Sequence, residues 1–193
     1  MKKRIVIFAS GSGTNAQNII NYFKSSSIAE VVLVVSNNTK AEVLQRAKNE
    51  NIKTYTFKKD MLSKEDGVLK ILKEARPDLI VLAGFLLKVP RLLLNAFPGK
   101  VINIHPALLP KYGGKGMYGH HVHQAVIDNK ETETGITIHF VNEHYDEGAV
   151  IFQTTTPLTT EDDPETTAAK VRVLEHRRFP EVIEQLLIAE TDD

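Results

Sequence analysis

Three short, unbroken runs of apolar residues constrain the fold of this chain more than any other feature. They cover residues 5–9, 31–35 and 79–83. A run of this length without polar alternation is typical of a strand that is buried on both faces of a sheet. Between the runs, apolar residues such as Ile19 and Phe23 recur at helical spacing. Strands that alternate with helices predict an α/β fold, in which helices cover both faces of a mostly parallel sheet.

The regular alternation ends after a further apolar strand at residues 101–105. Residues 106–119 hold two prolines and four glycines, which predicts a long loop of the kind that usually serves function. Residues 135–141 alternate apolar and polar side chains and predict a half-buried strand, and residues 149–153 predict another. We expect these two strands to extend a Rossmann-like sheet in the antiparallel sense. A last helix should follow, with a break or kink at Pro180.

The composition indicates a globular protein with a substantial core, and we expect one domain over residues 1–193. Twenty-four basic residues balance 24 acidic ones, so there is no electrostatic reason to expect nucleic acid or an anionic membrane as partner. The chain has no cysteine, which excludes disulfides, thiolate metal sites and a cysteine nucleophile. The apolar run at residues 5–9 is too short for a signal peptide or a membrane span, and we expect a cytoplasmic protein.

A glycine-rich turn joins the first strand to the first helix. Residues 11–16 read Gly-Ser-Gly-Thr-Asn-Ala, a pattern that lets backbone N–H groups approach a phosphate at a helix N-terminus. A dinucleotide, a phosphomonoester, or no ligand at all are compatible with this turn. A dinucleotide site requires an acidic residue about 20 positions later. Residues 35–38 read Val-Ser-Asn-Asn, which counts against the dinucleotide.

Two polar side chains stand at the end of the strand at residues 101–105. Asn103 and His105 alternate with apolar neighbours, so both project from the same face of the strand, and Pro106 ends it. A single histidine at a strand end is more often structural than catalytic. In this chain the neighbouring carboxamide can stabilise an oxyanion, and ligands bind at this edge of α/β sheets. Asp146, in an irregular loop, is a candidate to orient the imidazole, although the sequence does not bring it near His105.

Other polar clusters have simpler interpretations. His120, His121 and His123 match no standard zinc motif, and we interpret them as a polar junction between loop and helix without a metal. His139 lies on the polar face of its strand and should be solvated or hydrogen-bonded. No G-x-S-x-G motif is present, so a serine-hydrolase triad is not supported.

With these motifs in place, the chain resembles the formyltransferase family that uses 10-formyltetrahydrofolate. The resemblance runs essentially from end to end, and its most specific parts are residues 10–15, 81–85, 103–110 and 145–148. The stretch Asn-x-His-Pro-x-Leu-Leu-Pro at residues 103–110 is specific for the family. The short chain has no room for the extra domains of some members, and it resembles those that formylate 5′-phosphoribosylglycinamide (GAR) in purine synthesis.

This resemblance implies direct attack of the substrate amine on the formyl carbon of the folate, which acts as a co-substrate, with no metal. Asn103 would donate a hydrogen bond to the developing oxyanion. Protonated His105 would stabilise the same charge and handle protons. Asp146 would hold His105 and favour its charged form.

The resemblance also implies binding residues for both small molecules. Gly13, Thr14 and Asn15 would cradle the ribose phosphate, and Arg172 and Glu175 would contact the substrate from the last helix. Folate would lie between two segments of the chain, with Lys64 at its tail. The residues of these segments are Leu86, Leu87, Lys88, Val89, Asn142, Glu143, His144 and Tyr145. The catalytic Asn103 would also contact the folate. Leu87 stands where relatives often carry arginine. The loop at residues 111–119 would be a lid over the folate side.

Two alternatives remain open at this point. A formyltransferase that acts on another amine, such as a nucleotide-linked amino sugar, would use the same Asn, His and Asp set. A non-catalytic nucleotide-binding module of Rossmann type would use only the glycine-rich turn. The sequence does not separate a monomer from a homodimer.

Overall fold

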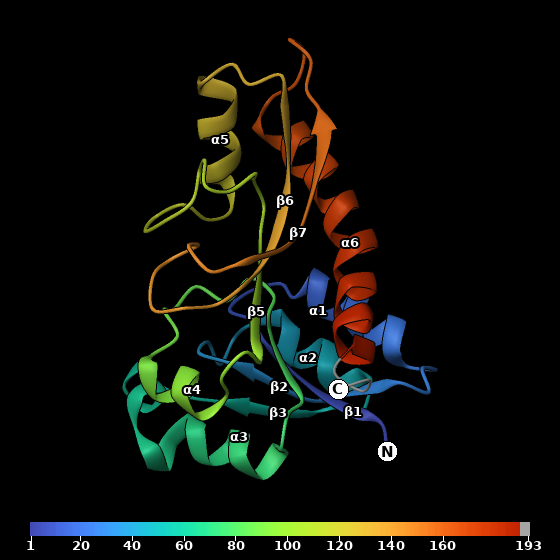
Figure 1. Ribbon diagram of the computed structural model, residues 1–193, viewed down its shortest axis with the longest axis vertical. Helices are drawn as coiled ribbons and strands as arrows, with labels where there is room; N and C mark the ends of the chain where they lie inside the picture. Colours follow the sequence, from blue (N-terminus) through green and yellow to red (C-terminus); the bar gives the residue numbers. More distant parts are fainter. Residues whose placement is uncertain (190–193) are drawn as a thin grey trace.

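A computed structural model describes residues 1–189, and the polar segment 190–193 lies outside the described residues. One seven-stranded sheet has the order β3-β2-β1-β4-β5-β6-β7 (Figure 1). Its strands are β1 (Lys3–Phe8), β2 (Ala29–Ser36), β3 (Lys53–Thr56), β4 (Leu79–Leu82), β5 (Val101–His105), β6 (Glu133–Phe140) and β7 (Val150–Pro157). The first five strands pair in parallel, and β6 and β7 add to them antiparallel. The predicted fold class is confirmed.

Helices cover both faces of the sheet. They are α1 (Thr14–Phe23), α2 (Glu42–Asn49), α3 (Lys70–Ala75), α4 (Arg91–Ala96), α5 (His120–Asp128) and α6 (Pro164–Ala189), and short turns η1 (Lys59–Ser63) and η2 (Glu65–Leu69) precede α3. Alternate residues of each central strand enter different cores: in β1, Ile5 and Ile7 face α1, α2 and α6, whereas Val6 and Phe8 face α3 and α4. Burial on both faces is the reason that these strands are apolar throughout.

Two expectations about local structure change: one strand is more buried than expected, and the last helix is continuous at its proline. Residues 134–139 of β6 are all buried, including the polar Thr137 and His139, so this strand is not half-exposed. Helix α6 runs through Pro180 without a break. Pro180 is itself buried in the helix face that packs on the sheet, and this packing holds the helix together across the missing hydrogen bond.

The order of the strands places a switch point between β1 and β4. From β1 the chain moves outward through β2 and β3, and then returns to the other side of β1 as β4. Ligands bind outside the carboxyl ends of strands at such a point. The loops after β1 and β4 meet there, where Ser10 N–H donates to Gly84 O (3.0 Å) and the Ser10 hydroxyl accepts from Leu86 N–H (3.0 Å). Among residues 1–189, no helix is long and apolar enough to cross a bilayer.

Gly13 shapes the turn at this point. Its φ of 72° is left-handed, and a Cβ at this position would overlap the side chain of Val43 in α2. We expect Gly13→Ala to lower the free energy of unfolding by about 2–4 kcal/mol, because backbone strain adds to a clash in the core. Urea unfolding at equilibrium measures the change. The matched control is Gly11→Ala, where a Cβ meets no atom within 4 Å. Equal losses in the two variants would contradict the prediction.

Candidate active site

A cavity of about 610 Å³ lies at the switch point. Its walls come from the N-terminus of α1, the ends of β4 and β5, the loop at residues 106–119, and helices α5 and α6. A narrower slot of about 70 Å³ adjoins it. The two spaces share Phe85, Asn103, Tyr145 and Asp146 as lining residues. A molecule in the cavity and a molecule in the slot would therefore meet beside Asn103 and Asp146.

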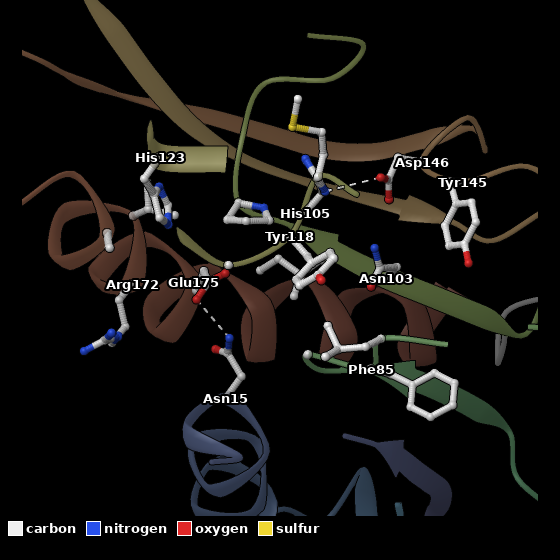
Figure 2. Close-up of a pocket in the computed structure, with 18 of the residues that line it drawn as sticks. Asn15, Phe85, Asn103, His105, Tyr118, His123, Tyr145, Asp146, Arg172 and Glu175 are labelled. Carbon is white, nitrogen blue, oxygen red and sulfur yellow. Dashed lines mark hydrogen bonds and ion pairs between the residues drawn. The ribbon is translucent and has the colours of Figure 1, made fainter. Parts of the chain in front are cut away.

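His105 is held on two sides at the end of β5. It is 3% exposed, and its Nε2 lies 2.7 Å from the backbone oxygen of Tyr112. Because a carbonyl only accepts, Nε2 carries the proton. Nδ1 lies 3.5 Å from Asp146 Oδ2 (Figure 2). Tyr112 and Asp146 both have a left-handed φ of 57°, a strained conformation that is concentrated at functional sites.

Asp146 is ionised at neutral pH. Burial acts to raise the pKa of its carboxyl, but contacts with His139, His105 and the Gly114 N–H outweigh burial and hold the pKa below its usual range. The Gly114 N–H donates to Oδ2 over 2.9 Å. Two chain segments 32 residues apart thus meet at this carboxylate. The sequence offered Asp146 as a candidate but could not show that it lies near His105.

Burial of His105 works against the protonated form of the ring that was expected. Burial lowers the pKa of His105 and outweighs the opposing effects of the Asp146 carboxylate and the Tyr112 carbonyl. Asp146 does favour the charged imidazole, as expected, but by less than burial disfavours it. At neutral pH the ring is mostly neutral, with its proton on Nε2 and a lone pair on Nδ1.

Asn103 is oriented by a buried histidine that the sequence did not single out for this role. His139 Nδ1 lies 2.9 Å from Phe140 O and carries a proton, and its Nε2 lies 3.2 Å from Asn103 Nδ2 and 3.7 Å from Asp146 Oδ1. The second N–H of Asn103 remains available to the cavity. The period of two along β6, visible in the sequence, puts Thr137 and His139 on one face. Only the pairing of β6 with β5 sets His139 opposite Asn103 and Thr137 opposite His105.

Most of the residues predicted to bind the phosphorylated substrate line the larger cavity. Thr14 and Asn15 line it from α1, and Arg172 and Glu175 line it from α6. Asn15 Nδ2 donates to Glu175 Oε2 over 2.9 Å. Burial raises the pKa of the Glu175 carboxyl, although Asn15 and Arg172 partly oppose it. Gly13 does not line the cavity and acts through the shape of the turn.

The residues predicted to bind folate divide into three groups. Those lining the slot are Leu87, Lys88, Val89, Asn103, Asn142, His144 and Tyr145. Leu86 instead lines the larger cavity. Glu143 and Lys64 form the third group and line neither space. Glu143 pairs with Arg91, and Lys64 pairs with Asp60 over 2.8 Å.

The loop expected as a lid lies along the larger cavity. Residues 114–119 line the larger cavity together with Asn15 and Arg172, and none of them lines the slot. The reason is local: Gly114 is tied to Asp146 and Tyr112 to His105, which directs the following residues toward α5. Within residues 1–189, no cluster of three or more metal-ligating side chains is present.

Comparison with known proteins agrees with this geometry. A family model described as formyl transferase matches residues 3–183. The chain belongs to the formyl transferase family. The phosphoribosylglycinamide formyltransferase of Haemophilus influenzae is 38% identical over 186 residues, which are 94% of this chain and 85% of that protein. A crystal structure of phosphoribosylglycinamide formyltransferase from Bacillus halodurans is 36% identical with a TM-score of 0.87, covering 96% of this chain and 95% of that one.

Two plant relatives are longer than this chain. The chloroplastic phosphoribosylglycinamide formyltransferase of Arabidopsis thaliana is 37% identical over 188 residues, which are 94% of this chain but 64% of that protein. For the corresponding protein of Vigna unguiculata the chain covers 61% of the relative's length. The chain thus spans less than two thirds of these relatives.

Proposed function

We propose that this chain transfers the formyl group of 10-formyltetrahydrofolate to the amine of GAR. The observation that carries the proposal is the meeting of two spaces at Asn103 and Asp146, beside His105. The larger one suits a phosphorylated amine and the slot suits part of a flat ring system. Relatives that cover nearly the whole chain are named phosphoribosylglycinamide formyltransferase, which supports GAR as the acceptor.

The slot has the chemistry that a pterin ring requires. Leu82, Leu87 and Val89 supply apolar walls. Among residues 1–189, neither the N–H nor the C=O groups of Leu87, Lys88 and Val89 take part in a hydrogen bond. An unpaired backbone edge can pair with the donor and acceptor edge of a heterocycle, as it does with an added strand. Leu87, in place of an arginine common in relatives, contributes apolar surface and this backbone.

The site residues then have complementary roles. The amine nitrogen attacks the formyl carbon, the new C–N bond forms, and negative charge develops on the formyl oxygen, to which Asn103 donates its free N–H. Neutral His105 takes the amine proton at Nδ1, because Nε2 already carries one. Asp146 stabilises the imidazolium so formed. The tetrahedral centre collapses as the bond to the folate nitrogen breaks, and that nitrogen receives the proton.

The two alternatives make different demands on the structure. A dinucleotide module needs a carboxylate after β2, but Asn37 accepts from the Ser10 hydroxyl (2.7 Å) and Asn38 donates to Ser10 O (3.4 Å). These contacts serve to tie the loop after β2 to the loop after β1. An amino-sugar acceptor would use the same catalytic residues, so only the acceptor itself separates this alternative from GAR.

An absorbance assay tests the proposal. It follows the loss of the formyl group from 10-formyl-dideazafolate, with and without GAR. We expect turnover that requires GAR. Turnover without any acceptor would indicate a deformylase, and turnover only with a nucleotide-linked amino sugar would change the acceptor. Absence of folate binding would favour the nucleotide-binding module.

A further inference from the structure

Gln153 of β7 makes two hydrogen bonds that no step of the proposed reaction uses. Its side chain is exposed, yet its Nε2 donates to the backbone oxygen of Leu109 (3.0 Å) and to Thr137 Oγ1 (2.8 Å). A carboxamide nitrogen has two hydrogens, so these two partners use both. A long exposed side chain loses conformational freedom when it is held in this way. The contacts therefore call for a role of Gln153 at Leu109.

Leu109 lies just after β5, where the pairing of the sheet has ended. Within residues 1–189, its backbone pairs with no other backbone group, and two side chains replace such a pairing. Its N–H donates to Thr137 Oγ1 (3.0 Å), and its oxygen accepts from Gln153. The Thr137 hydroxyl donates in turn to Ala107 O (2.7 Å). Strands β6 and β7 thus hold the start of the loop at residues 106–119.

The path of this loop sets the position of the Tyr112 carbonyl. Tyr112 follows Leu109 by three positions, and its oxygen lies 2.7 Å from His105 Nε2. The φ of Tyr112 is left-handed, at 57°, and a residue other than glycine keeps such a conformation only where its surroundings impose it. The Tyr112 hydroxyl donates to Glu131 Oε1 (2.8 Å). The contacts of Leu109 and of Glu131 are thus the two anchors of this carbonyl.

Two acceptors compete for the single ring proton of neutral His105. The Tyr112 oxygen lies 2.7 Å from Nε2, and Asp146 Oδ2 lies 3.5 Å from Nδ1. The carbonyl favours a proton on Nε2, whereas the carboxylate favours one on Nδ1. The shorter contact prevails in this structure. If the Tyr112 carbonyl moved away, the carboxylate would draw the proton to Nδ1, the nitrogen that has to accept the proton of the substrate amine.

We propose that Gln153 is a positioning residue, which holds residues 109–112 so that His105 keeps its proton on Nε2 and its lone pair on Nδ1. The consequence for catalysis rests on the proposed function, but the effect on the ring requires no substrate. Gln153 is not among the residues that line the cavity or the slot. It therefore acts on His105 through the loop.

Nitrogen-15 NMR of histidine-labelled protein tests the effect on the ring without substrates. At pH 8, wild-type His105 should show a protonated Nε2 and an unprotonated Nδ1, in signals assigned by their absence from His105→Ala. Gln153→Met keeps the length of the side chain but has no donor, and the form protonated on Nδ1 should become the major one. The matched control is Gln45→Met on α2, where the exposed amide donates to Asn49 Oδ1 over 2.8 Å. It should leave the ring as in the wild type.

Kinetics show whether the position of the proton matters. Gln153→Met should lower kcat for formyl transfer by about 3- to 10-fold, the worth of about one hydrogen bond, while KM for GAR and for 10-formyl-dideazafolate changes by less than about twofold. Gln153→Glu keeps the shape of the side chain, and its carboxylate has no hydrogen to donate, so it should act in the same direction.

A merely structural role would lower the free energy of unfolding without moving the ring proton. An Nε2 that stays protonated in both Gln153 variants would therefore overturn the proposal, and so would a proton moved to Nδ1 with unchanged kcat.

The positioning role and the proposed function can fail separately. If Gln153→Met moves the proton of His105 but the wild type does not turn over GAR, the role of Gln153 stands and the acceptor is wrong. If the wild type turns over GAR but the proton stays on Nε2 in both Gln153 variants, the reaction stands and the role of Gln153 is wrong.

Discussion

Replacing Asn103 with alanine is expected to lower kcat for formyl transfer by about 10²- to 10³-fold, the usual cost of one lost oxyanion donor. Asn103 is held by His139 at one N–H and offers the other to the place where the formyl oxygen would lie. The interaction strengthens only as charge develops, so the loss should appear in kcat, while both KM values change little. Steady-state kinetics with 10-formyl-dideazafolate and GAR measure both.

Two further variants make this test specific. Asn103→Asp keeps the shape of the side chain but has no N–H to donate and adds a negative charge, so it should be at least as impaired as the alanine variant. Asn129→Ala removes a carboxamide from the exposed end of α5, where it only donates to Ala125 O, and should keep full turnover. Near-normal kcat in either Asn103 variant would remove Asn103 from the mechanism.

The sequence predicted those parts of the fold that depend on short-range patterns. Unbroken apolar runs identified the parallel strands, because burial on both faces leaves no position for a polar residue. The period of two along residues 101–105 predicted that Asn103 and His105 share a face, and both line the same cavity. The glycine-rich turn was also recognisable, since Gly13 needs a left-handed backbone and a close approach to Val43.

The parts of the site that the sequence did not predict depend on contacts between distant segments, and no local pattern contains such contacts. Asp146 reaches His105 only through the pairing of β6 with β5 and the course of the loop that follows β6. The polar face of β6 is read as solvent-facing from the sequence, yet His139 is buried there because it supports Asn103. His123 looked like part of a polar junction, and only the packing of α5 beside α6 places it in the cavity wall. The cytoplasmic location and the oligomeric state stay predictions.

His105→Ala should have the largest effect of any single substitution in the site, lowering kcat by about 10²- to 10⁴-fold, the contribution of a positioned acid or base. The pH dependence of this loss in kcat shows whether the neutral ring or the imidazolium of His105 is the active form. Burial lowers the pKa of His105 below its usual value of 6.5, so the neutral ring predominates at pH 7.

The ratio of wild-type kcat to that of His105→Ala removes every titration that the two enzymes share, including that of the substrate amine. If neutral His105 accepts the proton, this ratio is level above pH 7 and falls as the pH drops through the pKa of His105. If the imidazolium is required, the ratio instead falls as the pH rises through that pKa, and the burial that makes His105 neutral would work against the reaction. The first result would make Asp146 a stabiliser of charge formed during the reaction, since its carboxylate lies 3.5 Å from the nitrogen that receives the proton.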